Sequence, residues 1–332
     1  MRIELIKKHI VAFSMGLVLA VSAVTTIPTN VYALDFTQDA NGNLLAEDEE
    51  KFFYMVPAGT EMTGECGLIL YGGNKPDIVL PKYCDNFKVT KVFSDFTSIF
   101  PLLPMKSFQT VKIPSGYKSI ESDAGGKVGA FQNQKDLYRI EIPKSVTDIG
   151  AHAFDGCDKT KLTFVAPKGS YARLYAISHE FFYTDSKKQA VNLFGNMMVV
   201  GEEKQIAVYN TNKKVSYTSS EPSVCAVGKN GKLVAKKAGT VKITVKVSKK
   251  TYSFSVTVKK RTKANVLKTI WENYVTEGMT DEEKKAAAKV WLDNHVTISG
   301  TNNTLKAAFV NGKASKSGYK KAYKEILAHY GL

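Results

Sequence analysis

The sequence predicts a multidomain, mainly β protein: a β-solenoid built from repeats, then a β-sandwich, then a small α-helical C-terminal region. Three observations predict this. Strand-like phrases ending in proline recur between residues 108 and 167, apolar and polar residues alternate over 241–258, and apolar residues recur at helical spacing over 319–330. The 332 residues suffice for two or three domains.

Charge divides the chain unevenly. The formal net charge is +15, but residues 34–185 carry 16 basic and 20 acidic groups, whereas residues 186–332 carry 27 and 10. The basic character therefore belongs to the C-terminal half. We expect five parts: a signal peptide over 1–33, an acidic mature N-terminus over 34–50, the repeats over 51–185, the sandwich over 190–260 and the helical region over 261–332.

The N-terminus has the pattern of an export signal. Three basic residues precede an apolar stretch over 10–24, and Val31 and Ala33 suit signal peptidase cleavage after Ala33. The alternative is a membrane anchor, for which the stretch is short. The length of the signal suggests a Gram-positive bacterium. Export would place the cysteines in an oxidising setting, and we consider Cys66 and Cys84 a candidate disulfide.

The repeats share a proline-terminated strand and a following aromatic. Phe108–Pro114 aligns with Leu137–Pro143, and each is followed by a second short strand and a turn ending in Phe131 or Phe154. Such units cannot bury their apolar faces alone, so they stack. These residues, with the turn Phe154–Cys157, resemble the BspA-type leucine-rich repeats of bacterial surface proteins. That resemblance implies ligand recognition by the repeats. The pattern is lost over 93–105, and the first copy carries an insertion over 123–128.

The following segment reads as antiparallel strands. Val241–Ser248 and Tyr252–Val258 alternate strictly, and Asn230–Gly231 is a hairpin signal. The segment resembles the group 2 bacterial immunoglobulin-like domain, a spacer and adhesion module of exported proteins. The resemblance implies display or binding, with no catalysis.

Six lysines lie on or beside the strand 241–248, and two of them share its outward face. They are a candidate binding patch for anionic wall polymers or sulfated glycans. The alternative is a solvated face that charge keeps soluble. The six are Lys236, Lys237, Lys242, Lys246, Lys249 and Lys250.

The tail is predicted to be helical. Thr280–Glu283 is a capping box, an earlier helix is expected over 263–275, and Tyr319–Tyr330 has helical periodicity. One interpretation is three packed helices. The other is a resemblance of Gly278–Lys284 and Gly318–Tyr323 to the microbial transglutaminase-like core.

In that family a cysteine stands two residues before the Gly-Tyr pair, at a helix N-terminus that lowers its pKa. Lys316 occupies the position here, and we expect the family's histidine and aspartate, which stand well downstream, to be missing, because His295 and His329 do not match the motif's histidine position. Because an ammonium cannot replace a thiolate, we expect a degenerate relic without activity of that class, and we predict that the protein is not an enzyme.

The sequence thus favours an exported surface or secreted binding protein, whose partner is a host or matrix protein or glycan, or an anionic cell-wall polymer. We expect no cofactor, no metal site, no catalytic residue and no membrane span in the mature chain. A fragment or pseudoenzyme of a transglutaminase-like transamidase or peptidase is the alternative. Nucleic-acid binding rests only on charge, and export argues against it.

Overall fold

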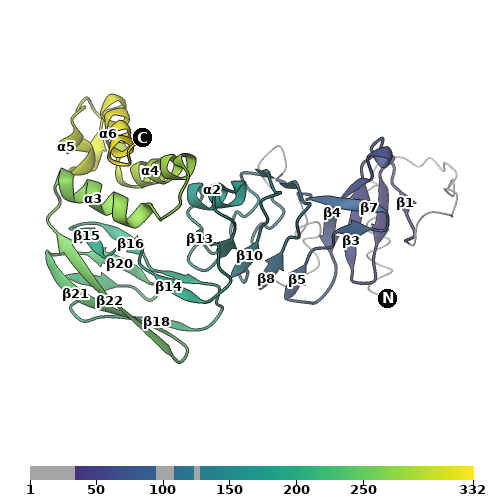
Figure 1. Cartoon of the computed structure of the whole chain (residues 1–332), viewed down its shortest axis with the longest axis horizontal. Helices are drawn as coiled ribbons and strands as arrows, with labels where there is room; N and C mark the ends of the chain where they lie inside the picture. The colour runs from purple at the N-terminus through teal and green to yellow at the C-terminus, as the bar shows by residue number, and fades with distance from the viewer. Residues whose placement is uncertain (1–33, 95–107, 123–127) are drawn as a thin grey trace. The chain divides into compact units, whose positions relative to one another are not determined.

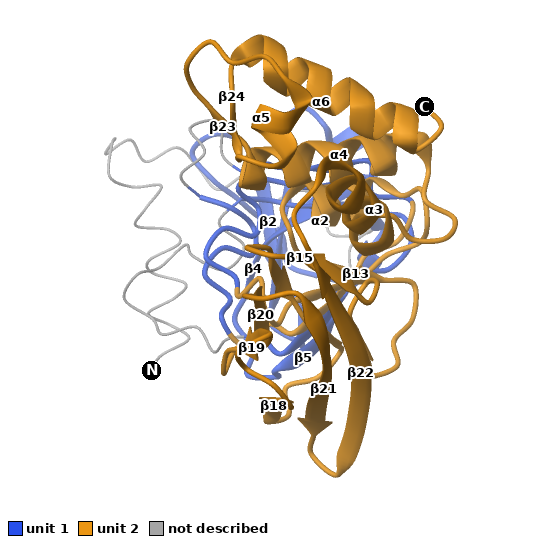
Figure 2. Ribbon diagram, turned by 90° about the vertical axis from the view of Figure 1, so that its left-hand side faces the viewer, with its two compact units in different colours: residues 1–135, 145–157 blue, residues 136–144, 158–332 orange. Residues whose placement is uncertain are grey.

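The computed structural model describes residues 34–94, 108–122 and 128–332. The predicted signal peptide over 1–33, most of the off-pattern segment over 93–105 and most of the insertion over 123–128 lie outside the described residues. The chain forms two compact units, one of residues 1–135 and 145–157 and the other of residues 136–144 and 158–332 (Figure 2). The protein is mostly β, with several sheets and a few helices toward the C-terminus.

Unit 1 contains an eight-stranded sheet. Its first strands are antiparallel neighbours, and parallel strands from the repeats then extend the sheet. In order these strands are β1 (Thr37–Gln38), β2 (Leu44–Glu47), β3 (Phe52–Val56), β4 (Glu65–Tyr71), β7 (Phe87–Val92), β9 (Ser119–Ile120) and β11 (Asp148–Ile149), with β6 (Tyr83–Cys84) paired to β7. The short helix η1 (Glu61–Thr63) precedes β4, and β5 (Asp77–Val79) pairs in parallel with β8 (Thr110–Lys112).

The repeat pattern accounts for the packing in unit 1. The phenylalanines of successive copies, Phe131 and Phe154, are fully buried and stack with their ring centroids 5.3 Å apart. The aromatics of these two copies therefore stack, as the repeat pattern predicts. Cys157 is also buried, and its thiol donates to the carbonyl of Phe131 at 3.2 Å. The cysteine at this turn is therefore a core residue.

Unit 2 begins with parallel strands from the last repeats. These are β10 (Arg139–Glu141), β12 (Thr163–Val165) and β13 (Phe182–Thr184), and α2 (Tyr171–Ser178) lies between β12 and β13 in the chain. Ser170 caps α2 by accepting from the backbone N–H of Arg173.

Three further sheets follow in unit 2 (Figure 1). One pairs β14 (Ala190–Asn192) with β17 (Ala207–Tyr209). The second has the order β15 (Met197–Val199), β22 (Lys250–Lys259), β21 (Gly239–Val247) and β18 (Val215–Ser219). The third has the order β16 (Glu203–Gln205), β20 (Lys232–Ala235) and β19 (Cys225–Val227). Inward side chains of all three sheets share one hydrophobic core, which includes Cys225 and Leu233. The alternation predicted over 241–258 is the reason, since it buries every second residue of β21.

Helices complete unit 2. They are α3 (Lys263–Tyr274), α4 (Asp281–His295), α5 (Leu305–Phe309) and α6 (Lys316–His329), and β23 (Thr297–Ile298) pairs in parallel with β24 (Lys313–Ala314). The predicted capping box at Thr280 and Glu283 is present. Three packed helices were expected in this region, and the structure has four. The additional helix is α5, which is too short to show helical periodicity in the sequence. Phe309 of α5 and Trp291 of α4 lie in one core that all four helices share.

Candidate functional site

Two of the six lysines singled out in the sequence lie on β21, and the other four lie just before or after it. Lys242 and Lys246 are exposed on its outward face, which confirms that they share a face. Lys236 and Lys237 precede the strand, and Lys249 and Lys250 lie at the hairpin after it. A nine-residue strand extends over about 26 Å. The six charges therefore follow one another along the strand as a row rather than in one cluster, but only Lys242 and Lys246 are on its outward face, and Lys250 pairs with the buried Val247.

Within the part of the chain that the structure describes, these lysines have no ionic partners. All six are exposed, and none forms an ion pair among the described residues. Their neighbours on the outward face are hydroxyl side chains, because Lys242 pairs with Ser255 and Lys246 pairs with Ser216 and Thr251. The strand thus presents uncompensated positive charge on a polar surface.

Lys316 stands where the transglutaminase-like resemblance places a nucleophile. It is the first residue of α6, and the hydroxyl of Ser315 caps that helix by accepting from the backbone N–H of Gly318 at 3.1 Å. The side chain of Lys316 is exposed. The predicted helix N-terminus is present, but it carries an ammonium, which cannot attack a carbonyl carbon while protonated.

The two cysteines proposed as a disulfide pair are buried thiols in unit 1. A hydrogen bond with Cys66, together with burial, raises the pKa of Cys84. The two thiols therefore lie next to each other, and a bridge between them stays a prediction.

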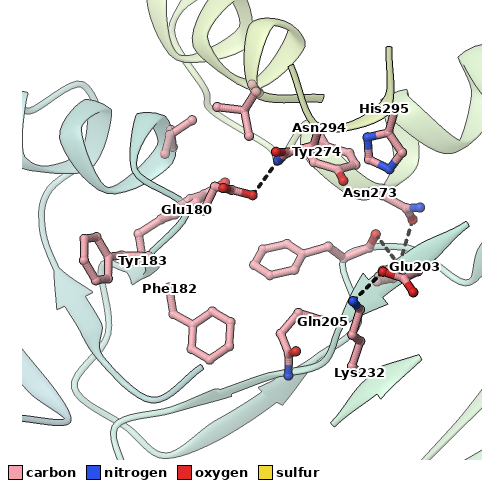
Figure 3. Close-up of a pocket in the computed structure, with 16 residues that line it drawn as sticks. Glu180, Phe182, Tyr183, Glu203, Gln205, Lys232, Asn273, Tyr274, Asn294 and His295 are labelled. Carbon is pink, nitrogen blue, oxygen red and sulfur yellow. Dashed lines mark hydrogen bonds and ion pairs between the residues drawn. The ribbon is translucent and has the colours of Figure 1, made fainter. Parts of the chain in front are cut away.

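Unit 2 also contains a cleft of about 470 Å³ (Figure 3). Its walls come from the end of the repeats, from β16 and β20, and from α3 and α4. The lining includes aromatic side chains, of which Tyr183, Phe194 and Tyr274 are half-buried. Nothing in the local sequence indicated this cleft, because its residues come from stretches that are widely separated in the chain.

The polar groups of the cleft are mostly paired with one another. Asn294 donates to a carboxylate oxygen of Glu180 at 2.6 Å, and Lys232 forms an ion pair with Glu203. Burial lowers the pKa of His295, and its Nδ1 lies 2.8 Å from the carbonyl oxygen of Trp291. The cleft therefore has balanced charge and offers aromatic faces and amides.

A polar cluster with the half-buried Lys204 and the buried Glu202 and Asn273 lies at one edge of the cleft. The ammonium nitrogen of Lys204 contacts the Asn273 side-chain oxygen at 2.8 Å and the carbonyl oxygens of Phe194 and Gly195 at 3.0 and 2.8 Å. The amide nitrogen of Asn273 donates to Glu202 at 3.3 Å and to the carbonyl of Met197 at 3.2 Å. Glu202 and Asn273 are 2 % and 6 % exposed. This cluster holds α3 against β15 and β16.

A second buried cluster joins α2 to α4. The Glu283 carboxylate is 1 % exposed and lies 3.3 Å from Nε of Arg173, which is itself 5 % exposed. The same carboxylate accepts from the backbone N–H groups of Gly169 and Thr280 at 3.1 and 2.9 Å. Arg173 also lies over the ring of Tyr183. Glu283, the residue that completes the cap of α4, thus also binds α4 to α2 at the end of the repeats.

Comparison with known proteins supports two of the three resemblances. Residues 104–213 match the BspA type leucine rich repeat region, in six copies. Residues 213–260 match the bacterial Ig-like domain. Neither match extends into residues 261–332, so the transglutaminase-like resemblance stays a prediction. We found no curated protein that matches this chain.

Two solved structures resemble parts of the chain. A GH10 xylanase from termite gut that contains a bacterial Ig-like domain shares 22 % identity, over 24 % of this chain and 22 % of that one, with a TM-score of 0.19. An intimin mutant from EHEC O157:H7 shares 12 % identity, over 41 % of this chain and 82 % of that one, with a TM-score of 0.21. The chain thus spans about a fifth of the length of the xylanase.

The repeat and Ig-like regions fit a surface or adhesion protein. Among the described residues, no helix has the length and apolar character needed to cross a bilayer.

Proposed function

We propose that the chain is an exported surface or secreted binding protein of a Gram-positive bacterium. In this proposal the repeats recognise a host or matrix ligand, and the basic Ig-like region contacts an anionic polymer. The observation that carries the polymer contact is the row of six exposed lysines on and beside β21, none of which forms an ion pair with another described residue. A row about 26 Å long suits an extended polyanion better than a small anion, because a small anion would reach only one or two of the charges.

The expected effect of removing this row follows from the energy of exposed charge contacts. If each contact contributes about 0.3 kcal/mol, six of them contribute about 2 kcal/mol, which corresponds to a roughly 20-fold change in affinity. Exposed charges are strongly screened by salt, so binding should weaken as ionic strength rises.

The test is co-sedimentation of the full chain with purified Gram-positive cell walls across a salt series. The variant replaces all six lysines with glutamine. The matched control replaces six exposed lysines of the helical region, which also lack ion pairs among the described residues: Lys306, Lys313, Lys316, Lys320, Lys321 and Lys324. Salt-sensitive binding that only the first variant loses is the expected result. An equal loss in both would show that net charge alone matters, and an absence of binding at low salt would overturn the polymer contact.

We also propose that residues 261–332 have no transamidase or peptidase activity. The exposed Lys316 ammonium at the start of α6 supports this, because the expected thiolate is replaced. Glutamine–lysine crosslinking or peptide hydrolysis by the purified chain would instead support the alternative of a transglutaminase-like enzyme.

A further inference from the structure

Lys204, Asn273 and Glu202 bring an amine, an amide and a carboxyl group together inside unit 2. The Lys204 nitrogen lies 2.8 Å from the Asn273 amide oxygen, and the amide nitrogen lies 3.3 Å from the nearer Glu202 oxygen. The amine and the carboxyl group thus contact opposite ends of the same amide. The lysine and the asparagine are 69 positions apart in the chain.

Burial shifts the pKa values of Lys204 and Glu202 in opposite directions. It lowers the pKa of Lys204 to about 7. At neutral pH, Lys204 is therefore a neutral amine in a large fraction of the molecules. Burial raises the pKa of Glu202, which favours the protonated carboxylic acid over the charged form. A neutral amine is a nucleophile, and a carboxylic acid can deliver a proton to a departing group.

We propose that Lys204 and Asn273 become joined by an intramolecular amide bond within the folded chain. The Lys204 nitrogen attacks the side-chain carbonyl carbon of Asn273, and a carbon–nitrogen bond forms. The bond from that carbon to the original amide nitrogen breaks, and this nitrogen leaves as ammonia. One proton moves from the attacking amine to the leaving nitrogen, so the reaction needs no oxidant, metal or other reactant.

Glu202 is placed to move that proton. Its Oε1 lies beside the nitrogen that departs, while its Oε2 is held by the backbone N–H of Val199 at 2.8 Å. As an acid it protonates the leaving nitrogen, and as the resulting carboxylate it takes the proton released by the lysine. Glu202 therefore ends the reaction as it began. This is general acid–base catalysis by a group fixed within hydrogen-bond reach of the reacting atoms.

The backbone next to the cluster also favours close approach. Gly195 has φ +92°, and a Cβ at this position would lie 2.7 Å from the Asn273 side-chain oxygen. A larger residue would therefore displace the amide that the lysine must reach. The carbonyl oxygens of Phe194 and Gly195 hold the lysine nitrogen from the other side.

The bond would close a covalent ring from residue 204 to residue 273. The ring includes all of residues 213–260, which match the bacterial Ig-like domain. An exported protein gains resistance to unfolding and proteolysis from such a link, as it does from a disulfide, without dependence on redox conditions. This inference is independent of the proposed polymer contact.

Mass spectrometry of the purified full chain tests the proposal directly. Trypsin cannot cut after an acylated lysine, so the linked product is the peptide 189–213 joined to the peptide 269–284. Its mass should equal the sum of the two peptides minus one ammonia. Recovery of Lys204 and Asn273 only in unlinked peptides of the wild-type chain would overturn the proposal, whatever the variants show.

Matched variants test the assigned roles. Lys204→Arg keeps the positive charge and Glu202→Gln keeps the shape, and each should abolish the link. Lys232→Arg and Asn294→Ser change the same residue types in the same cleft and should leave the link intact. A link that persists in Glu202→Gln would contradict the role of Glu202. If both control variants also lose the link, its loss in the test variants does not depend on the geometry of Lys204, Asn273 and Glu202, and the assigned roles would be wrong.

Discussion

Replacement of Glu283 by glutamine tests whether the buried joint between α2 and α4 stabilises unit 2. Glutamine has nearly the same shape and can still accept from the backbone of Thr280, so the capping contact is largely preserved. The change removes the negative charge that faces Arg173, whose side chain is only 5 % exposed. An uncompensated buried charge costs about 3 kcal/mol. We expect the free energy of unfolding to fall by about that amount.

Glu282→Gln is the matched control. Glu282 lies next to Glu283 in the first turn of α4 but is exposed. The same substitution there loses only a favourable contact with the helix dipole, which is worth about 0.5 kcal/mol. The contrast between the two variants therefore isolates the buried charge from the general effect of an acid at a helix N-terminus.

Urea unfolding followed by tryptophan fluorescence measures the difference. The chain has two tryptophans, Trp271 in α3 and Trp291 in α4, so the signal reports on the helical region. A double variant with Arg173→Met should recover much of the loss, since it removes the unpaired charge. Equal unfolding midpoints for Glu283→Gln and Glu282→Gln would refute the reasoning.

Two further predictions concern titratable groups. The hydrogen bond to Cys66 and burial raise the pKa of Cys84, so the Cys84 thiol should react slowly with oxidised glutathione at neutral pH, and a 66–84 disulfide should form faster as pH rises; peptide mapping that finds only glutathione adducts would exclude the bridge. Burial lowers the pKa of His295, so below about pH 6.5 the unfolded chain binds a proton that the folded chain does not. Stability should then fall as pH falls from 7 to about 5, and His295→Gln should flatten this dependence in urea midpoints; an unchanged profile would contradict it.

Local sequence patterns predicted the long strands β21 and β22 and the helices α4 and α6 of unit 2. The alternation over 241–258 determines which side chains of β21 and β22 are buried, because the side-chain period of a strand is two residues. Thr280 and Glu283 indicated the start of α4, because a capping box satisfies backbone donors within four residues of chain. The spacing over 319–330 likewise predicted which residues of α6 face the core.

The repeats were also recognisable from sequence, because each copy repeats the same strand and aromatic at corresponding places. Phe131 and Phe154 stack as the periodicity predicts. The helix α5 was missed, since five residues are too few to show a period of 3.6. The chemical identity of the six lysines was evident, but their arrangement in a row required the register of β21 with its neighbours.

The clusters of unit 2 were decided only by tertiary structure. Glu283 reads as an ordinary capping residue, yet its carboxylate also faces Arg173 and accepts from Gly169, which is 114 positions away. Lys204 reads as one basic residue among many until packing of α3 on β15 and β16 brings Asn273 and Glu202 to it. The amino-acid sequence alone determined the elements and their buried faces, because those depend on periods of a few residues. Distances between side chains far apart in the chain, and the pKa shifts that burial causes, arise only once separate elements pack together.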